Sequence, residues 1–550
     1  MKKEVEQRII LGSRNRLLSL PSLMSLVTAV GALYCDLAVS APTATAHSIH
    51  RIKHFVVIYM ENHSFDNRFG SWEGVNGRLG TFIKQVNQDG IEFQCLPQTI
   101  SNLSRVPVTC VDALNGVESG FTNEAFNLAN YQCDPLKVPD CENPLDQLTH
   151  QFYQEIYQLN HGKMNRYVVA NNTVGATASY TDTTWLPLYQ YLHTPGLKVR
   201  YAILDSFFHA AFGGSFLNHQ WLVSAATPTW PNAVNDGGKT DLHSVVDSNG
   251  MPNSADSHNG FPPPLYRSPT PTLVIDSKLT ASCSPTFARG STPPDTVCGD
   301  YVVNTSQPLQ QPYLPGTADY ERVPFQTHPT IGDRLTARGV TWAWYAGGWN
   351  AALAARSNIY NGGTPNFQPH HQPFNYYAAF DPLSHLANRQ LHLKDFDAEF
   401  LQAAQAGSLP AVSFYKPQGN LNQHAGYASV ADGDAHIAQV IARLQESPQW
   451  KNMLIVVTYD ENGGIYDHAP VPQGDRWGPG SRIPAIIISP YARKGFVDHT
   501  QYDTGSILRF LTRRFALQPL PGVLERDAGL RANGAAPMGD LSNALNLPQN

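Results

Sequence analysis

The sequence predicts an α/β fold with a mainly parallel sheet, and two observations lead to this prediction. Short apolar runs rich in β-branched residues recur along the chain, as buried parallel strands do. The clearest runs span residues 54–60, 199–204, 341–345, 412–415, 453–458 and 483–489. Segments with helical apolar spacing lie between them, the clearest at residues 330–338, 434–445 and 504–515. Strands that alternate with helices form sheets with a helical layer on each face.

Two of the predicted helices carry recognisable start signals and apolar faces. The segment 434–445 has Asp434 near its start, where a carboxylate suits the helix dipole. The residues on its apolar face are Ile437, Val440, Ile441 and Leu444. The segment 504–515 follows Asp503, a candidate N-cap, and its apolar residues are Ile507, Leu508 and Leu511. We therefore expect both helices to pack one face against the sheet.

Composition favours one large globular domain with many loops. The chain has 550 residues, a formal net charge of −6, 42 Gly and 41 Pro. No basic stripe is present, so nucleic acid is not an expected partner. Residues 71–150 and 225–325 lack long periodic elements and read as loop-rich insertions. We expect residues 47–550 to form a single catalytic domain that carries these two insertions.

Residues 1–46 read as an export signal peptide. Basic residues start the segment, an apolar stretch spans residues 17–34, and small residues follow. The alternative is a membrane anchor, because the apolar stretch is roughly long enough to span a bilayer. The preferred interpretation predicts a secreted or periplasmic protein with no stable membrane anchor after cleavage.

Cysteine usage agrees with an oxidising compartment. Removal of the signal would remove Cys35 and leave an even number of cysteines. They form three close pairs in the sequence, which are Cys95/Cys110, Cys133/Cys141 and Cys283/Cys298. Other connectivities are possible, so these pairs are only the local expectation.

Three of the predicted strands lead into polar clusters. Glu61 and Asn62 follow the run 54–60, and Asp460 and Glu461 follow the run 453–458. The run 199–204 leads into Asp205 and then into the segment 213–219, GGSFLNH, which contains Ser215. A single cluster of this kind is often only a turn. Three together favour a ligand site, because ligands bind at the carboxyl ends of parallel strands.

The residue types in these clusters suggest metal-assisted chemistry. Neighbouring carboxylates repel each other unless they are protonated or bind a cation. Oxygen ligands favour one divalent ion such as Mg²⁺, Ca²⁺ or Mn²⁺, and the 20 histidines keep Zn²⁺ possible. Ser215 would become a nucleophile beside such an ion. The alternative for Ser215 is a helix cap.

Histidines could bind an oxyanion or protonate a leaving group. The candidates are His161, His371 and His424. By spacing alone each is better explained as a surface or core histidine. The residues themselves therefore indicate an exported α/β protein with a metal-assisted hydrolase site.

Four segments resemble one known family. They are residues 52–66 (IKHFVVIYMENHSFD), 371–376 (HQPFNY), 459–468 (YDENGGIYDH) and 478–491 (GPGSRIPAIIISPY). They resemble the bacterial phosphoesterase family of phospholipase C and acid phosphatase A, over about residues 50–515. The resemblance implies an alkaline-phosphatase-like core and a metal-dependent site.

The resemblance also implies roles for individual residues. The implied metal ligands are Glu61, Asn62, Ser215, Asp460 and Glu461. Ser215 also lies where the family has its nucleophile, and the implied phosphate-site histidines are His161, His371 and His424. The serine resembles the phosphatase branch, since phospholipase C members generally have threonine there.

The expected function is therefore that of an exported metal-dependent acid phosphatase, which hydrolyses phosphomonoesters through a phosphoserine intermediate. Two alternatives stay open. One is a phospholipase C that cleaves phosphodiester head groups, so the substrate is either a small phosphate ester or a phospholipid. The other is a non-catalytic exported binding protein on the same scaffold.

Overall fold

The computed structural model describes residues 49–78, 80–97, 106–131, 148–171, 176–230, 245–246, 266, 274–275, 301–303, 310–318, 322–359 and 366–547. These residues belong to one compact unit, residues 44–550. The predicted signal segment lies outside the described residues, and so do Cys35, Cys133, Cys141, Cys283 and Cys298. Within the described residues, no helix has the length and apolar character that crossing a membrane requires.

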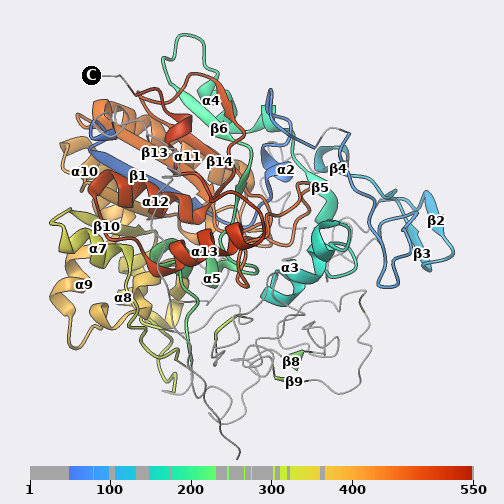
Figure 1. Ribbon diagram of the computed structural model, residues 1–550, viewed down its shortest axis with the longest axis horizontal. Coiled ribbons are helices and arrows are strands. Elements are labelled where there is room, and N and C mark those ends of the chain that lie inside the picture. The colour runs from blue at the N-terminus through green and yellow to red at the C-terminus, as the bar shows by residue number, and fades with distance from the viewer. Residues whose placement is uncertain are drawn as a thin grey trace, which may run out of the picture. The chain divides into compact units, whose positions relative to one another are not determined.

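A large sheet forms the centre of the described fold (Figure 1). Within the described residues it has eight strands in the order β11-β10-β12-β1-β13-β14-β6-β15. Their bounds are β1 His54–Met60, β6 Tyr201–Leu204, β10 Trp342–Ala346, β11 Leu393–Asp395, β12 Val412–Lys416, β13 Met453–Tyr459, β14 Ala485–Ile488 and β15 Phe496–Asp498. The neighbours β12, β1 and β13 run parallel. The predicted α/β fold with a mainly parallel sheet is thus confirmed.

The direction of one strand differs from the prediction. The run 483–489 was expected to be parallel, but β14 pairs antiparallel with both β13 and β6. The reason lies in the connection. The chain leaves β13 at its carboxyl end, forms the loop 460–484 without an intervening helix, and enters β14 from that same edge. A parallel strand would need a crossover to the opposite edge.

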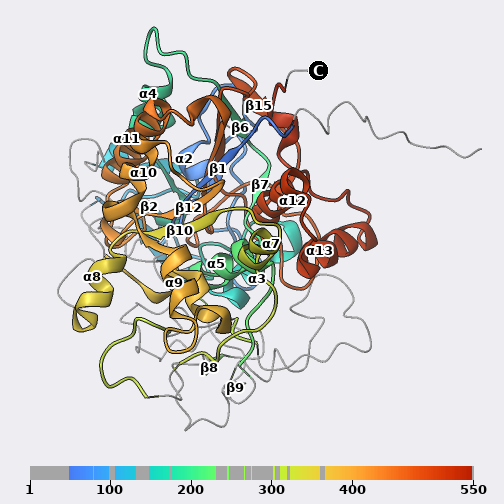
Figure 2. The ribbon, with the colours of Figure 1, turned by 90° about the vertical axis from the view of Figure 1, so that its left-hand side faces the viewer.

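Helices cover both faces of the sheet (Figure 2). The α-helices are α2 Phe65–Arg68, α3 Phe152–Leu159, α4 Pro187–Leu192, α5 Ser215–Ser224, α7 Ile331–Ala337, α8 Trp349–Ala354, α9 Leu386–His392, α10 Leu401–Ala406, α11 Val430–Glu446, α12 Thr504–Phe515 and α13 Pro521–Ala532. The helices α4, α10 and α11 form one layer, and α5, α7 and α12 lie on the opposite face. Phe510 of α12 stacks on Phe55 of β1, with 5.0 Å between ring centroids, so this layer packs directly on the sheet.

The predicted helices are present with small changes at their ends. The helix α12 matches its predicted bounds, with Asp503 at its N-cap. The helix α7 starts after Thr330, whose hydroxyl accepts a hydrogen bond from the Asp333 amide. The helix α11 starts earlier than expected because Ser429 caps it. Asp434 therefore lies inside this helix, where its carboxylate accepts a hydrogen bond from the Leu188 amide of α4.

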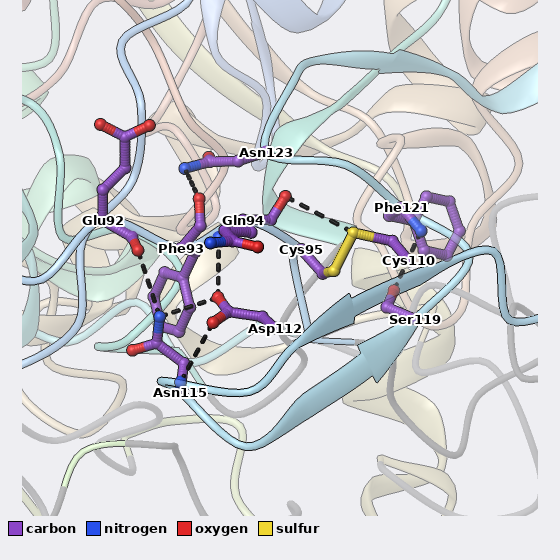
Figure 3. The surroundings of a disulfide bond; sticks show 10 residues. All are labelled: Glu92, Phe93, Gln94, Cys95, Cys110, Asp112, Asn115, Ser119, Phe121 and Asn123. Atoms are coloured by element: carbon purple, nitrogen blue, oxygen red, sulfur yellow. Dashed lines mark hydrogen bonds between the residues drawn. A yellow bond between two sulfur atoms is a disulfide. The ribbon is translucent and has the colours of Figure 1, made fainter.

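Shorter strands complete the described fold. They are β2 Cys110–Asp112, β3 Val117–Ser119, β4 Phe126–Asn127, β5 Ser179–Tyr180, β7 Phe207–Phe208, β8 Val245–Val246, β9 Val274–Ile275 and β16 Tyr502–Asp503. The strands β2 and β3 form an antiparallel hairpin inside the first predicted insertion. Figure 3 shows the expected disulfide between Cys95 and Cys110, which joins this hairpin to the preceding segment. Asp112 adds a hydrogen bond from the Gln94 amide at 2.7 Å.

Candidate active site

Three neighbouring parallel strands end in charged residues at one edge of the sheet. Lys416 is the last residue of β12, Glu61 follows β1, and Asp460 follows β13. The register pairs Met60 with Tyr459, so Glu61 and Asp460 leave the sheet side by side. All three charged side chains are buried. Two carboxylates and one ammonium group therefore meet at the carboxyl edge of the sheet.

A group of oxygen atoms surrounds the hydroxyl of Ser215. Ser215 Oγ lies 3.3 Å from Asn62 Oδ1 and 3.4 Å from Glu461 Oε1. Asp460 Oδ1 accepts hydrogen bonds from the Asn62 amide at 3.1 Å and from the Glu461 amide at 2.8 Å. Four of the residues predicted from the sequence thus contact one another directly.

The local backbone explains how these side chains converge. Asn62 has a φ of 62°, in the left-handed region that few residues other than glycine adopt. Gly463 faces it, and a Cβ at Gly463 would lie 2.6 Å from the Asn62 carbonyl oxygen. Ser215 is the first residue of α5, with Gly214 as the N-cap. The Ser215 side chain is consequently directed to Asn62 and Glu461 and does not cap the helix.

Glu61 is held by both of its carboxylate oxygens. Oε1 lies 3.2 Å from His371 Nε2 and 3.9 Å from His370 Nε2. Oε2 accepts a hydrogen bond from Asn422 Nδ2 and lies 3.3 Å from Lys416 Nζ. Burial alone would raise the pKa of Glu61, but Lys416 and the histidines outweigh it and hold this pKa well below its usual range. Glu61 is thus ionised.

The pKa values of the two carboxylates after β13 shift in the opposite direction. Burial is the main cause that raises the pKa of Asp460 to about 7. Burial and the neighbouring Asp460 raise the pKa of Glu461 well above its usual range. Within the described residues, Asp460 Oδ2 is buried without a hydrogen-bond partner. An unsatisfied buried oxygen beside a second carboxylate fits a bound cation, which would favour both ionised forms.

These pKa shifts predict how metal binding depends on pH. Mn²⁺ added to chelator-treated protein is expected to raise the Tm more at pH 8 than at pH 5. Asp460, with a pKa of about 7, is protonated at pH 5, and the proton must leave before a cation binds. One such proton weakens binding roughly 100-fold between pH 8 and pH 5. Differential scanning fluorimetry, referenced to the chelated protein at each pH, measures the gain. Equal gains at both pH values would contradict the prediction.

The histidines near Ser215 differ in part from the expected set. His371 contacts Glu61, and His424 stacks on Tyr427 with 4.3 Å between ring centroids. His161, in contrast, is exposed in the turn after α3, and the structure does not place it among these buried residues. His150 lies there: its Nε2 is 3.3 Å from Asn62 Nδ2 and 3.4 Å from Glu461 Oε1.

The positions of His150 and Lys416 carry only weak sequence signals. His150 lies just before Gln151, the N-cap of α3, so the start of that helix brings it to the site. Lys416 follows the predicted run 412–415 directly, just as Glu61 follows the run 54–60. Burial lowers the pKa of His150 to about 4 and that of His371 to about 3. Both imidazoles are therefore neutral in the free site.

Two groups in the described residues have the spacing of metal ligands. One is Glu61 with His370 and His371, next to Lys416. The other is Asp66 with Asp467 and His468, but there the guanidinium of Arg482 already pairs with the carboxylates. Arg482 Nη2 is 2.8 Å from Asp66 Oδ1, and Arg482 Nε is 3.0 Å from Asp467 Oδ1. This buried ion cluster ties the segment after β1 to the segment after β13.

A serine hydroxyl, buried carboxylates and histidines thus lie at the carboxyl edge of a mainly parallel sheet. The Phosphoesterase family model matches residues 52–518, so this chain belongs to the Phosphoesterase family. The predicted family is thereby confirmed.

Curated relatives carry the name phospholipase C. The chain is 28% identical over 243 residues to Phospholipase C B of Mycobacterium tuberculosis. This match covers 39% of this chain and 42% of that protein. It is 27% identical over 254 residues to Non-hemolytic phospholipase C of Pseudomonas aeruginosa, covering 40% of this chain and 33% of that protein. The match thus spans less than half the length of each relative.

A solved structure of a protein in the alkaline phosphatase superfamily from Vibrio parahaemolyticus matches at 11% identity and a TM-score of 0.26. The match covers 69% of this chain and 67% of that protein. The assignment of the α/β fold rests on the strand order and pairing described above.

Proposed function

We propose that this chain is an exported, metal-dependent acid phosphatase that hydrolyses phosphomonoesters through a phosphoserine on Ser215. One observation carries the proposal. Ser215 Oγ, a buried hydroxyl at the start of α5, lies within 3.4 Å of Asn62 Oδ1 and Glu461 Oε1. A hydroxyl among carboxylate and amide oxygens has the surroundings of a metal-activated nucleophile.

The proposed ligands of one divalent ion are Glu61, Asn62, Ser215, Asp460 and Glu461. The set is rich in oxygen, which favours Ca²⁺, Mg²⁺ or Mn²⁺, with Zn²⁺ as an alternative. When bound, such an ion lowers the pKa of a ligating hydroxyl and neutralises charge on phosphate oxygens.

Ser215 Oγ attacks the phosphorus atom in line, so that a serine–phosphorus bond forms as the bond to the alcohol oxygen breaks. Its position at the N-terminus of α5 supports negative charge there, because free backbone amides and the helix dipole point to it. The proton of the Ser215 hydroxyl passes to a neutral histidine, which delivers it to the departing alcohol oxygen. Water then hydrolyses the phosphoserine, which releases phosphate and restores the Ser215 hydroxyl. The proton donor is proposed to be His424 or His371.

The hydrogen bonds of two histidines assign their tautomers. His150 Nδ1 lies 2.5 Å from the Leu148 carbonyl oxygen, and His424 Nδ1 lies 2.6 Å from the Ala425 carbonyl oxygen. A contact with a carbonyl requires N–H, so Nε2 of each neutral ring is a proton acceptor. Once protonated, it can donate to a phosphate oxygen or to the departing alcohol. We propose that His150 takes the role expected for His161.

A phospholipase C is the second candidate, since that is the name of the relatives above. A comparison of p-nitrophenyl phosphate with p-nitrophenylphosphorylcholine separates the two. We expect the purified metal-loaded protein to turn over the monoester at least tenfold faster. Turnover of the choline diester alone would overturn the monoester proposal and keep the same site for a diesterase. Turnover of neither would favour a binding protein on this scaffold.

Export is part of the same proposal. It is supported by the basic and apolar pattern of residues 1–46 and by the Cys95–Cys110 disulfide, which persists in oxidising compartments. We also propose that residues 47–550 act as one catalytic domain. The insertions 71–150 and 225–325 would then select the substrate.

A further inference from the structure

Lys416 is buried in contact with two of the proposed metal ligands. Its Nζ lies 3.3 Å from Glu61 Oε2 and 4.0 Å from Asp460 Oδ2, and its side chain is fully buried. The position follows from the sheet. The strand β12 lies next to β1, so the residue at its carboxyl end faces the residues that follow β1 and β13.

Packing of the sheet does not explain the charge of Lys416. Burial of an ammonium group costs several kcal/mol of desolvation, and only pairing with buried carboxylates offsets that cost. Besides the two carboxylates, Lys416 Nζ has one further hydrogen bond in the described residues, to the Met60 carbonyl oxygen at 3.5 Å. The positive charge of Lys416 therefore serves to balance the two carboxylates, and the packing of the sheet does not require it.

The charges of the buried groups give Lys416 a specific effect. Glu61, Asp460 and Glu461 contribute three negative charges when ionised, and Lys416 contributes one positive charge. The net charge of these four groups is −2, which a single divalent cation would neutralise. Without Lys416, the same carboxylates would match a trivalent cation.

We propose that Lys416 is an internal cation that matches the charge of the site to one divalent ion and disfavours ions of higher charge. Lys416 is a positioning residue in this proposal: together with Asn422 it holds Glu61 Oε2, and so fixes the direction in which Oε1 points. The inference rests on the proposed metal dependence.

The test compares a trivalent and a divalent probe in the full folded chain. Terbium binding is measured by its luminescence, and Mn²⁺ binding by electron paramagnetic resonance of the free ion. In Lys416→Met, we expect the preference for Tb³⁺ over Mn²⁺ to rise at least about tenfold, because a nearby positive charge repels Tb³⁺ more. Lys416→Arg keeps the charge and is expected to keep the wild-type preference. Lys394→Met, in the edge strand β11, is the matched control for loss of a lysine.

The possible results separate the inference from the proposed function. If the wild type binds no divalent ion, the proposed metal dependence fails. If the wild type binds Mn²⁺ but Lys416→Met shows an unchanged preference or loses both ions, the inference alone is overturned. If Lys416→Met does not fold by itself, refolding is done with each ion in turn. Recovery with Tb³⁺ but not with Mn²⁺ supports the inference, and any other result contradicts it.

Discussion

Ser215→Ala is expected to lower the turnover of p-nitrophenyl phosphate by roughly 10⁴-fold, because the variant has no oxygen to form the bond to phosphorus. The overall fold should persist, since the hydroxyl does not cap α5. Turnover is measured with metal-loaded protein. Acid quenching with labelled substrate should trap phosphate on the wild-type chain and none on the variant.

Ser224→Ala is the matched control, because Ser224 lies in the same helix and its hydroxyl donates to the Gln220 carbonyl oxygen. It should leave turnover within about threefold of the wild type. Full activity of Ser215→Ala, or trapped phosphate on that variant, would exclude Ser215 as the nucleophile. A vanadate complex in which vanadium is not bonded to Ser215 Oγ would lead to the same conclusion.

Arg482→Met is expected to lower the free energy of unfolding by roughly 3–5 kcal/mol. Arg482 is buried and its guanidinium lies between Asp66 and Asp467, with further bonds to the carbonyl oxygens of Asn76 and Asp205 at 2.7 and 2.8 Å. Its removal leaves two buried carboxylates without their cation. Urea unfolding followed by tryptophan fluorescence measures the change.

Arg443→Met provides the comparison, since Arg443 is exposed and, among the described residues, its ion pair is with Glu446 one helical turn away in α11. It should change the free energy of unfolding by no more than about 0.5 kcal/mol. If Arg482→Met unfolded at the same urea concentration as the wild type, the buried ion cluster would have no structural role.

Local patterns are sufficient to predict the sheet and the polar edge. After His54 the run 54–60 is apolar because β1 is covered on both faces, and its bounds match the prediction. The same reasoning locates β13, and Asp460 and Glu461 at its end. Asn62, Ser215, Asp460 and Glu461 meet as expected because ends of parallel strands share one edge.

Features that depend on long-range contacts could not be predicted in this way. The direction of β14 depends on the path of the loop 460–484, which no local pattern specifies. The choice between His150 and His161 depends on which one faces Asn62, and both flank the same helix. The pairing of Lys416 with Glu61 joins residues of adjacent strands that are far apart in the sequence.

That separation has a consequence for the newly made chain. Asp460 is synthesised about 400 residues after Glu61. The strand β1 lies between β12 and β13, so its two neighbours in the sheet are both synthesised late. A nascent or truncated chain that ends before residue 460 lacks Asp460 and Glu461, two of the five proposed metal ligands. The proposed cation site can therefore form only after β12 and β13 have joined β1 in the sheet.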